Sequence, residues 1–290
     1  MLLQLVVSGL AMGAIYGLIA LGFTLIWNAV GIVNFAQGDL VMLGAYISVG
    51  WLDHSLHLPW TVNALLMLAA MAVAGFLLAR LVYHPVRNAA QLAAIVATLG
   101  LSLALENGAV LVWGPEPMTY PGPFGNATVT LGTAKIYDQD LLIIAVLVLL
   151  MALQTLMFRR TTWGKAMRAT AQDREMARLM GVRTDRVIAV IFAYAAVLAG
   201  VAGVLLAPIF YVSSTMGSLA ALKAFAASII GGFGNVVGAV VGGLLLGVVE
   251  SLGSYFLTPQ YIDVISFGLL ILFLVARPQG IFGEPEMERP

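Results

Sequence analysis

Long apolar runs separated by short polar stretches occupy almost the whole of this sequence. A helix that spans a bilayer needs roughly 20 mostly apolar residues. By that criterion the pattern predicts spans near residues 3–27, 38–52, 60–83, 91–113, 140–158, 187–210, 236–257 and 261–276. A shorter apolar stretch, 218–231, carries Lys223 and predicts a further helix that is broken or re-entrant, with the lysine reaching the outer surface.

These segments are expected to be helices, because a backbone in lipid must satisfy its own hydrogen bonds and the runs are too long and too uniformly apolar for barrel strands. The first run continues well past residue 20 and lacks a basic start, so we expect a retained span rather than a signal peptide. The predicted fold class is therefore all-α: a polytopic transmembrane helix bundle of about eight or nine spans, with residues 1–290 forming one domain.

Composition supports a membrane protein and excludes several other classes. The chain is 61% hydrophobic and 10% charged, whereas a typical soluble domain is about 45–50% apolar and about 25% charged. It has no cysteine, so disulfides, zinc–thiolate sites and thiol nucleophiles are excluded. A net charge of zero offers no basic face for nucleic acid. The histidines, His54, His57 and His84, lie in short loops or at span ends and form no metalloprotease or serine-protease pattern, so we expect neither catalytic residues nor a metal site.

Lysine and arginine predict the orientation in the membrane. Loop 159–186 contains most of the cations, namely Arg159, Arg160, Lys165, Arg168, Arg174, Arg178, Arg183 and Arg186. Basic loops stay in the cytoplasm, so this loop is predicted to lie inside, together with Arg80, Arg87 and the C-terminal Arg277. Loop 114–139 has Lys135 as its one cation and many prolines and glycines, so it is predicted to be external, with a short hairpin near residues 128–130.

The number of crossings adds a constraint. The chain must cross an odd number of times between an external loop 114–139 and an internal C-terminus, and the full-length spans in that part are even in number. The stretch 218–231 is therefore predicted to traverse. By the same reasoning the N-terminus lies outside if residues 1–35 cross once.

Small residues recur at helical spacing in two places. One row is Gly9, Gly13 and Gly17, and the other is Gly234, Gly238 and Gly242, with Gly243 and Gly247 beside it. Such rows let helix backbones approach closely where the hydrophobic effect cannot drive association. Two interpretations stay open: general helix packing, or helices that line a narrow path or slide past one another.

The basic loop has more structure than a topology signal requires. Between residues 163 and 182, small or apolar residues alternate with charges at near-helical spacing, which predicts one or two short amphipathic helices outside the membrane. Gly181 is placed to end such a helix. A solvated loop that only fixes topology is one interpretation, and a docking surface for another protein is the other.

The sequence Glu-Met-Ala-Arg-Leu-Met-Gly at 175–181 resembles the EAA-xxx-G motif of ABC importer permeases, with Met176 as a departure. The wider string from Gly164 to Val182 resembles branched-chain amino-acid permeases of the LivH type, in the family that takes up hydrophobic amino acids, urea and short amides. In that family this loop couples the permease to the ATPase. The resemblance carries the ATPase-coupling role to Gly164, Arg168, Asp173, Glu175, Ala177 and Gly181.

The same family is resembled by Val-Asn-Phe-Ala-Gln-Gly-Asp at 33–39, by Gly-Gly-Phe-Gly-Asn-Val-Val-Gly-Ala at 231–239 and by Arg-Pro-Gln-Gly-Ile-Phe-Gly at 277–283. Members often have histidine where Gln37 stands. The resemblance runs from about residue 5 to residue 285 and implies a bacterial inner-membrane permease that imports branched-chain amino acids by alternating access. The implied partners are a homologous second permease subunit, two ATP-binding cassette subunits and a periplasmic substrate-binding protein. Urea or short amides remain an alternative substrate.

No Gly-x4-Gly-Lys-Ser/Thr string occurs, so no loop of that kind cradles a nucleotide phosphate in this chain. We therefore expect no cofactor in this subunit, with ATP and Mg²⁺ bound by the partner ATPases. A secondary amino-acid carrier driven by an ion gradient is the other transport class considered. That mechanism would need paired acids within the membrane, and Glu106 and Glu250 are the candidates.

Polar residues at membrane depth are the candidates for the substrate path, because they are expensive there and often functional. They are Asn34, Gln37, Glu106 and Asn235, together with the neighbouring Gly38. The competing interpretation is that these side chains satisfy local backbone at helix breaks or make buried contacts between helices.

Overall fold

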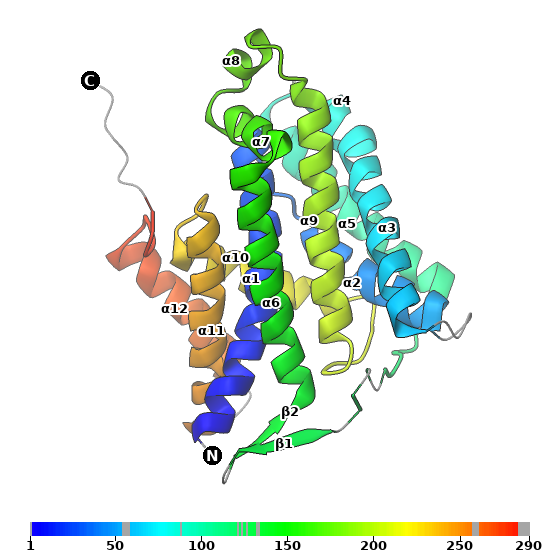
Figure 1. Ribbon diagram of the computed structural model, residues 1–290, viewed down its shortest axis with the longest axis vertical. Coiled ribbons are helices and arrows are strands. Elements are labelled where there is room, and N and C mark those ends of the chain that lie inside the picture. The colour runs from blue at the N-terminus through cyan, green and yellow to red at the C-terminus, as the bar shows by residue number, and fades with distance from the viewer. Residues whose placement is uncertain are drawn as a thin grey trace.

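The computed structural model describes residues 2–53, 59–87, 89–120, 122, 124–125, 127–131, 134–256 and 261–283. His54 and His57 lie outside the described residues. Figure 1 shows a bundle of roughly parallel and antiparallel helices with a small hairpin at one end and two short helices at the other. The predicted all-α transmembrane class is confirmed.

Six of the described helices are long and apolar enough to cross a membrane. They are α1 (Leu2–Val30), α3 (Trp60–Leu78) with its continuation to Val86, α5 (Gln91–Trp113), α6 (Asp138–Arg160), α9 (Thr184–Leu206) and α11 (Val236–Phe256). The continuation of α3 consists of the π-helix η2 (Ala79–Tyr83) and α4 (His84–Val86). The shorter apolar helices are α2 (Gln37–Tyr46) with the π-helix η1 (Ile47–Asp53), α10 (Met216–Gly231) and α12 (Ile262–Ala276).

The predicted hairpin is confirmed by strands β1 (Thr128–Leu131) and β2 (Ala134–Tyr137), which pair antiparallel with Thr128 opposite Tyr137. The predicted amphipathic helices are confirmed by α7 (Thr162–Gln172) and α8 (Arg174–Leu179). The hairpin and the α7–α8 pair lie at opposite ends of the bundle (Figure 1).

The chain ends can be placed relative to these two ends of the bundle. The Ser8 hydroxyl of α1 donates to Asp140 at the start of α6, at 2.8 Å, and Ser251 of α11 donates to the Leu5 carbonyl, at 2.6 Å. The start of α1 therefore lies at the hairpin end, beside the start of α6 and the end of α11. Because α1 is one continuous helix, residues 1–35 cross once, which meets the condition for an N-terminus on the hairpin side.

Two helices begin inside the bundle rather than at its surface. The Gln37 side-chain amide at the start of α2 donates to the carbonyl of Ala195, halfway along α9, at 3.2 Å. The start of α2 also meets the start of α10, because a methyl group on Gly38 would come within 2.7 Å of the Gly217 carbonyl oxygen. The predicted full span at 38–52 is therefore a second broken helix. The Gln37 side chain binds the backbone of α9 there and allows the chain to re-enter inside the bundle.

The broken helix α10 still completes a crossing together with the segment before it. Val212 exchanges backbone hydrogen bonds of 2.9 Å with Met118, in the loop that leads to the hairpin. At the far end of α10, the Ile230 carbonyl accepts from Ile281 in the segment after α12, at 2.9 Å. The prediction that 218–231 belongs to a traversing segment is confirmed.

The bundle contains two similar halves that run in opposite directions. Helices α1, α2, α3 and α5 correspond in order to α9, α10, α11 and α12. The contact of α1 with α11 has its counterpart in that of α9 with α3, and the contact of α2 with α9 has its counterpart in that of α10 with α1. The broken helices α2 and α10 occupy equivalent positions and touch each other. Inverted repeats of this kind, with a broken helix in each half, are typical of membrane transporters.

The glycine rows lie at helix contacts. A methyl group on Gly13 would come within 2.7 Å of the Gly243 carbonyl oxygen, which shows that the backbones of α1 and α11 are in direct contact. Gly238 and Gly242 lie on another face of α11, against Gly231 and Ala227 of α10. Gly13, Gly238 and Gly242 therefore lie at packing contacts between neighbouring helices, which supports the first of the two interpretations. Gly234 differs, because it has φ +97° and lies in the turn before α11.

Candidate functional site

Helix α7 folds back against the end of α6 because of two local features. The Thr161 hydroxyl accepts a hydrogen bond from the Gly164 N–H at 3.0 Å, which caps the start of α7. A methyl group on Gly164 would come within 2.5 Å of the Phe158 Cα atom in the last turns of α6. Gly164 is therefore buried where the chain reverses, and it sets the angle between the membrane span and the helices outside it.

Helix α8 is short but capped at both ends. The Asp173 carboxylate accepts hydrogen bonds from the N–H groups of Glu175 and Met176, each at 2.9 Å. At the other end, Gly181 has φ +86°, its N–H donates to Arg178 and the N–H of Val182 donates to Ala177, each at 3.0 Å. This pair of bonds is the Schellman motif, so the predicted role of Gly181 as a helix cap is confirmed.

Removing the N-terminal cap of α8 should loosen this helix alone. We expect Asp173→Ala to destabilise α8 by about 1 kcal/mol, because two backbone donors lose their acceptor. Hydrogen exchange measured by mass spectrometry should be faster in peptides covering α8 and unchanged in peptides covering α9. Unchanged exchange in α8 would show that the cap does not hold the helix.

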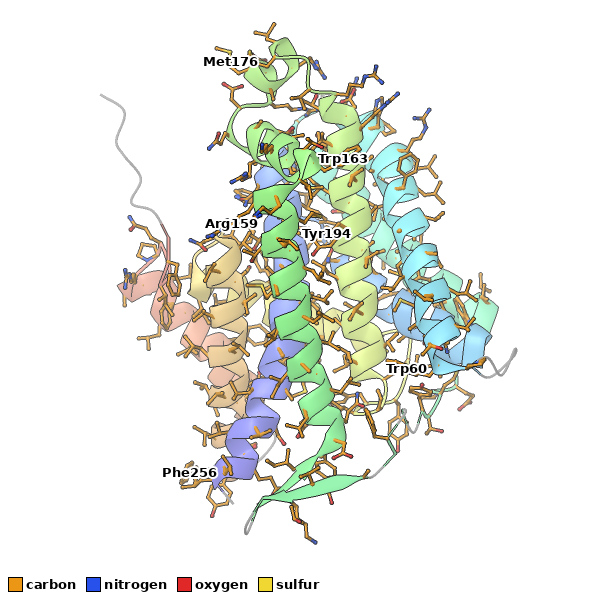
Figure 2. The ribbon with its side chains drawn as sticks, in the orientation of Figure 1. Trp60, Arg159, Trp163, Met176, Tyr194 and Phe256 are labelled. Carbon is orange, nitrogen blue, oxygen red and sulfur yellow. The ribbon has the colours of Figure 1, made fainter. Side chains whose placement is uncertain are left out.

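The outer face of α8 is apolar and open. Met176, Leu179 and Met180 are 61%, 80% and 84% exposed, while Ala177 on the inner face is buried. Figure 2 shows Met176 at the tip of the molecule, beyond the ends of the long helices. Exposed apolar side chains rimmed by polar residues mark sites of protein–protein contact, and methionine is enriched in such contacts. Glu175 and Asp173 are exposed on α8, and Arg168 is exposed on α7.

A cluster of charges fastens the α7–α8 unit to the bundle. Asp185 in the first turn of α9 pairs with Arg87 at 2.9 Å and with Arg174 at 3.3 Å. Arg174 also donates to the Tyr83 hydroxyl at 2.9 Å, and Arg178 lies 3.7 Å from Asp185. Sequence reasoning missed Asp185 as an anchor. The sequence signal that could have found it is a single acid at the start of a span, beside a loop that carries many cations.

Asn34, Gln37 and Gly38 lie together at the start of α2, inside the bundle. Asn34 and Gln37 are buried, and the Asn34 side-chain oxygen accepts from the N–H of Ala36 at 3.3 Å. The Asn34 amide reaches the Gln37 side-chain oxygen at 3.5 Å, and Gly22 of α1 leaves room for the Gln37 side chain. These contacts satisfy backbone and side-chain groups at the helix break.

The starts of α2 and α10 are flanked by two acids. Glu106 of α5 accepts a hydrogen bond from Ser218 in the first turn of α10 at 2.9 Å. Asp39 in the first turn of α2 is buried, interacts with Ser102 of α5 and lies near Glu106. Glu106 therefore lies at the same helix break as Gly38, which it reaches from α5.

Asn235 lies elsewhere. Its side-chain oxygen accepts from the N–H of Gly238 at 2.9 Å and caps α11, and its amide donates to the Phe282 carbonyl at 3.1 Å. Both contacts are in the turn between α10 and α11, which also binds the segment after α12. The structure does not bring Asn235 together with Asn34, Gln37 or Glu106.

The expectation that Lys223 reaches the outer surface is wrong. Lys223 is only 7% exposed, and its ammonium lies 2.9 Å from a carboxylate oxygen of both Glu250 and Asp263. Glu250 also accepts hydrogen bonds from Tyr16, at 2.8 Å, and from Ser266. The partners lie on α1, α11 and α12, so burial is possible because the charge is neutralised within the bundle.

A cavity of about 370 Å³ opens beside this cluster, between α1, the segment 207–215 and α10. Its walls are mainly apolar or aromatic, with Met12, Tyr16, Leu206, Phe210, Met216 and Leu219 among them, and Lys223 is at one side. The cavity is large enough for a small solute, and its lining suits an apolar side chain.

Residues 5–274 match the family described as the permease component of branched-chain amino acid transport systems. The high-affinity branched-chain amino acid transport permease LivH of Salmonella typhimurium is 37% identical, over 99% of this chain and 97% of that protein. BraD of Pseudomonas aeruginosa, with the same description, is also 37% identical over 99% and 97%. Among solved structures, PsaBC from Streptococcus pneumoniae in complex with Fab has a TM-score of 0.50 at 14% identity, covering 94% of this chain and 92% of that chain, which supports the fold alone.

Proposed function

Because this chain belongs to the permease component family of branched-chain amino acid transport systems, we propose that it is the membrane-spanning permease subunit of an ABC importer for branched-chain amino acids. Relatives that carry this function match it over nearly their full length. The mostly apolar cavity beside α10 favours a hydrophobic side chain over urea or a short amide, because most of its lining cannot form hydrogen bonds with the polar atoms of those solutes.

The observation that carries the proposal is the α7–α8 unit. Its apolar face, with Met176, Leu179 and Met180, lies outside the spans and has a fixed shape because Asp173 and Gly181 cap α8. We assign this face to contact with an ATP-binding cassette subunit. Gly164 packs α7 directly against α6, so a movement of α7 and α8 would also move the membrane span α6.

The remaining partners follow from the same proposal. Two ATP-binding cassette subunits supply ATP, Mg²⁺ and hydrolysis, a homologous second permease completes the path, and a periplasmic binding protein delivers the amino acid. The basic α7–α8 end faces the cytoplasm by the positive-inside rule, which puts the hairpin and the N-terminus on the periplasmic side of the inner membrane. Alternating access then moves the two inverted halves, with the starts of α2 and α10 at their junction.

An ion-coupled carrier is the weaker candidate. It would need two acids that share a proton or cation, and Glu106 and Glu250 belong to separate clusters. Glu106 accepts from Ser218, whereas Glu250 is neutralised by Lys223. The acid pair suggested by the sequence is therefore not formed, and the acid near Glu106 is Asp39 instead.

The test is to place a charge on the apolar face of α8. Leu179→Asp should reduce ATP-driven leucine uptake about thirtyfold, because burying an anchor residue at an interface contributes about 2 kcal/mol. Co-purification with the ATPase subunit should fall in parallel, while expression of the permease stays normal. Thr162→Asp adds the same charge at the exposed start of α7 and should leave both readouts near wild type.

Two outcomes separate the parts of the proposal. Normal uptake and normal co-purification for Leu179→Asp, and also for a Glu175→Arg/Gly181→Val double variant, would exclude α8 as the coupling surface. Normal co-purification of ATPase with wild-type permease, but no transport of any branched-chain amino acid, would leave the coupling role standing and overturn the substrate.

A further inference from the structure

A second cavity lies at the α7 end of the bundle, where α1, α6, α7, α9 and α11 come together, and has a volume of about 300 Å³. Two arginines from different helices line it, Arg159 at the end of α6 and Arg168 on α7. Much of the remaining wall is apolar, including Leu25, Met167 and Ile191. This cavity is separate from the one beside Lys223. The cavity beside Lys223 is lined by the segment 207–215 and the first half of α10.

The two arginines bring positive charge that nothing in the described part of the cavity wall neutralises. No carboxylate is among its described lining residues, and neither arginine has an ion pair or a hydrogen bond within the described residues. The arginines of the nearby anchor behave differently, since Arg87, Arg174 and Arg178 all share Asp185. Both arginines are exposed to solvent, and no described carboxylate stands beside them in the cavity wall, so the open side of the cavity favours an anion.

A buried amide in the same wall lacks a partner. Gln154 is 2% exposed, and its side-chain oxygen accepts from the Tyr194 hydroxyl at 3.3 Å. Its Nε2 group has no hydrogen-bond partner within the described residues. A buried N–H donor without an acceptor destabilises a protein, so an acceptor in the cavity would remove this penalty. Figure 2 shows Arg159 and Tyr194 on the neighbouring helices α6 and α9 in this part of the bundle.

We propose that this cavity binds a phosphate group. Guanidinium groups bind phosphate oxygens through two parallel hydrogen bonds, and the free Gln154 amide adds a donor. Arg159 is the next-to-last residue of a span, which is the depth of lipid head groups, and basic pockets between transmembrane helices on the cytoplasmic side bind such groups. The apolar part of the wall, with Leu25 and Ile191, suits the glycerol and acyl chains of an anionic phospholipid.

The position of the cavity gives the ligand a structural role. Arg168 belongs to α7 and Arg159 to α6, so one phosphate would join the membrane span to the helix outside it. The α7–α8 unit would then be held by the anchor at Asp185 on one side and by the phosphate on the other. This inference concerns an anion at the end of the bundle, and its test does not depend on which solute is transported.

The experiment uses the full-length chain purified in a neutral detergent with the subunits that accompany it. Binding is followed by thermal stability during titration with phosphatidylglycerol, and in a separate arm with sodium phosphate against sodium chloride at equal ionic strength. We expect phosphatidylglycerol to raise the melting temperature saturably, and Arg159→Gln to weaken its apparent affinity about tenfold, because a charge-assisted hydrogen bond is lost. Arg160→Gln removes the same charge one residue away, outside the cavity wall, and should bind like wild type.

Gln154→Glu gives an independent arm. It keeps the acceptor for Tyr194 and replaces the free donor with an anion, so the response to phosphatidylglycerol should disappear while the unliganded protein stays folded. If Arg159→Gln does not fold, Arg159→Lys keeps the charge without the planar fork and should bind more weakly than wild type. An Arg159-dependent response to sodium phosphate alone would identify a soluble phosphate as the source. Equal weakening by Arg159→Gln and Arg160→Gln, or no response to either ligand, would overturn the proposal.

Discussion

Lys223→Met is expected to lower the stability of the folded bundle by about 3–5 kcal/mol, because it leaves Glu250 charged and buried without its cation. Asp263 loses the same partner but is half exposed and can be hydrated. Lys223 and Glu250 belong to α10 and α11, and the Tyr16 hydroxyl from α1 binds the same carboxylate, so loss of the cation affects three helices at once. Thermal unfolding in detergent, with retained monodispersity as the readout, measures the effect.

A second substitution separates lost charge pairing from lost packing. The double variant Lys223→Met/Glu250→Gln removes both charges and should recover most of the stability, since a glutamine oxygen can still accept from Tyr16. Lys135→Met, in the exposed part of the hairpin, is the control for a lysine-to-methionine change and should match wild type. A Lys223→Met protein as stable as Lys135→Met would show that the buried network contributes nothing.

Gly13→Val is expected to destabilise the protein by about 3 kcal/mol, because the new side chain meets backbone and not a flexible side chain. A first methyl group would already lie within 2.7 Å of the Gly243 carbonyl oxygen and of the Leu244 Cα atom, so α1 and α11 must separate. Gly100→Val, on α5, has open space around the added atoms and serves as the matched control. Expression and thermal stability of the two variants, measured side by side, test the prediction.

The result also distinguishes packing from movement. If close approach of α1 and α11 only holds the bundle together, Gly13→Val should reduce the amount of folded protein, and the folded fraction should transport normally. Equal stability of Gly13→Val and Gly100→Val would contradict the close contact itself.

The spans, the hairpin and the α7–α8 pair could be predicted because their signals are local. A long apolar run must be helical in lipid, and a glycine that ends a short amphipathic stretch is expected to adopt the positive φ of a helix C-terminal cap. Gly181 acts on backbone atoms within a few residues, so the sequence alone located the end of α8. The cap at Asp173 is equally local but was not predicted. The six coupling positions carried over by resemblance lie in or beside this locally determined unit.

The interior of the bundle could not be predicted, because its contacts join residues far apart in the chain. The stretch 38–52 is apolar enough for a full span. It begins inside the bundle instead, because the Gln37 side chain binds the Ala195 carbonyl of α9. A lone lysine in an apolar stretch is expected to reach water unless an acid is known to lie beside it, and Glu250 is on a different helix. Asn235 has glycine-rich surroundings like those of Asn34, yet it caps α11 in the turn after α10, away from the start of α2.

The meeting of α2 and α10 has an electrostatic consequence. Each helix carries a partial charge of about +0.5 at its N-terminus, and here two such ends face each other within the membrane, where little water screens them. Asp39 and Glu106 lie beside these ends, where an ionised acid would offset the partial charge of the helix N-termini. Any movement of α2 against α10 would therefore change the charge around the junction as well as its packing.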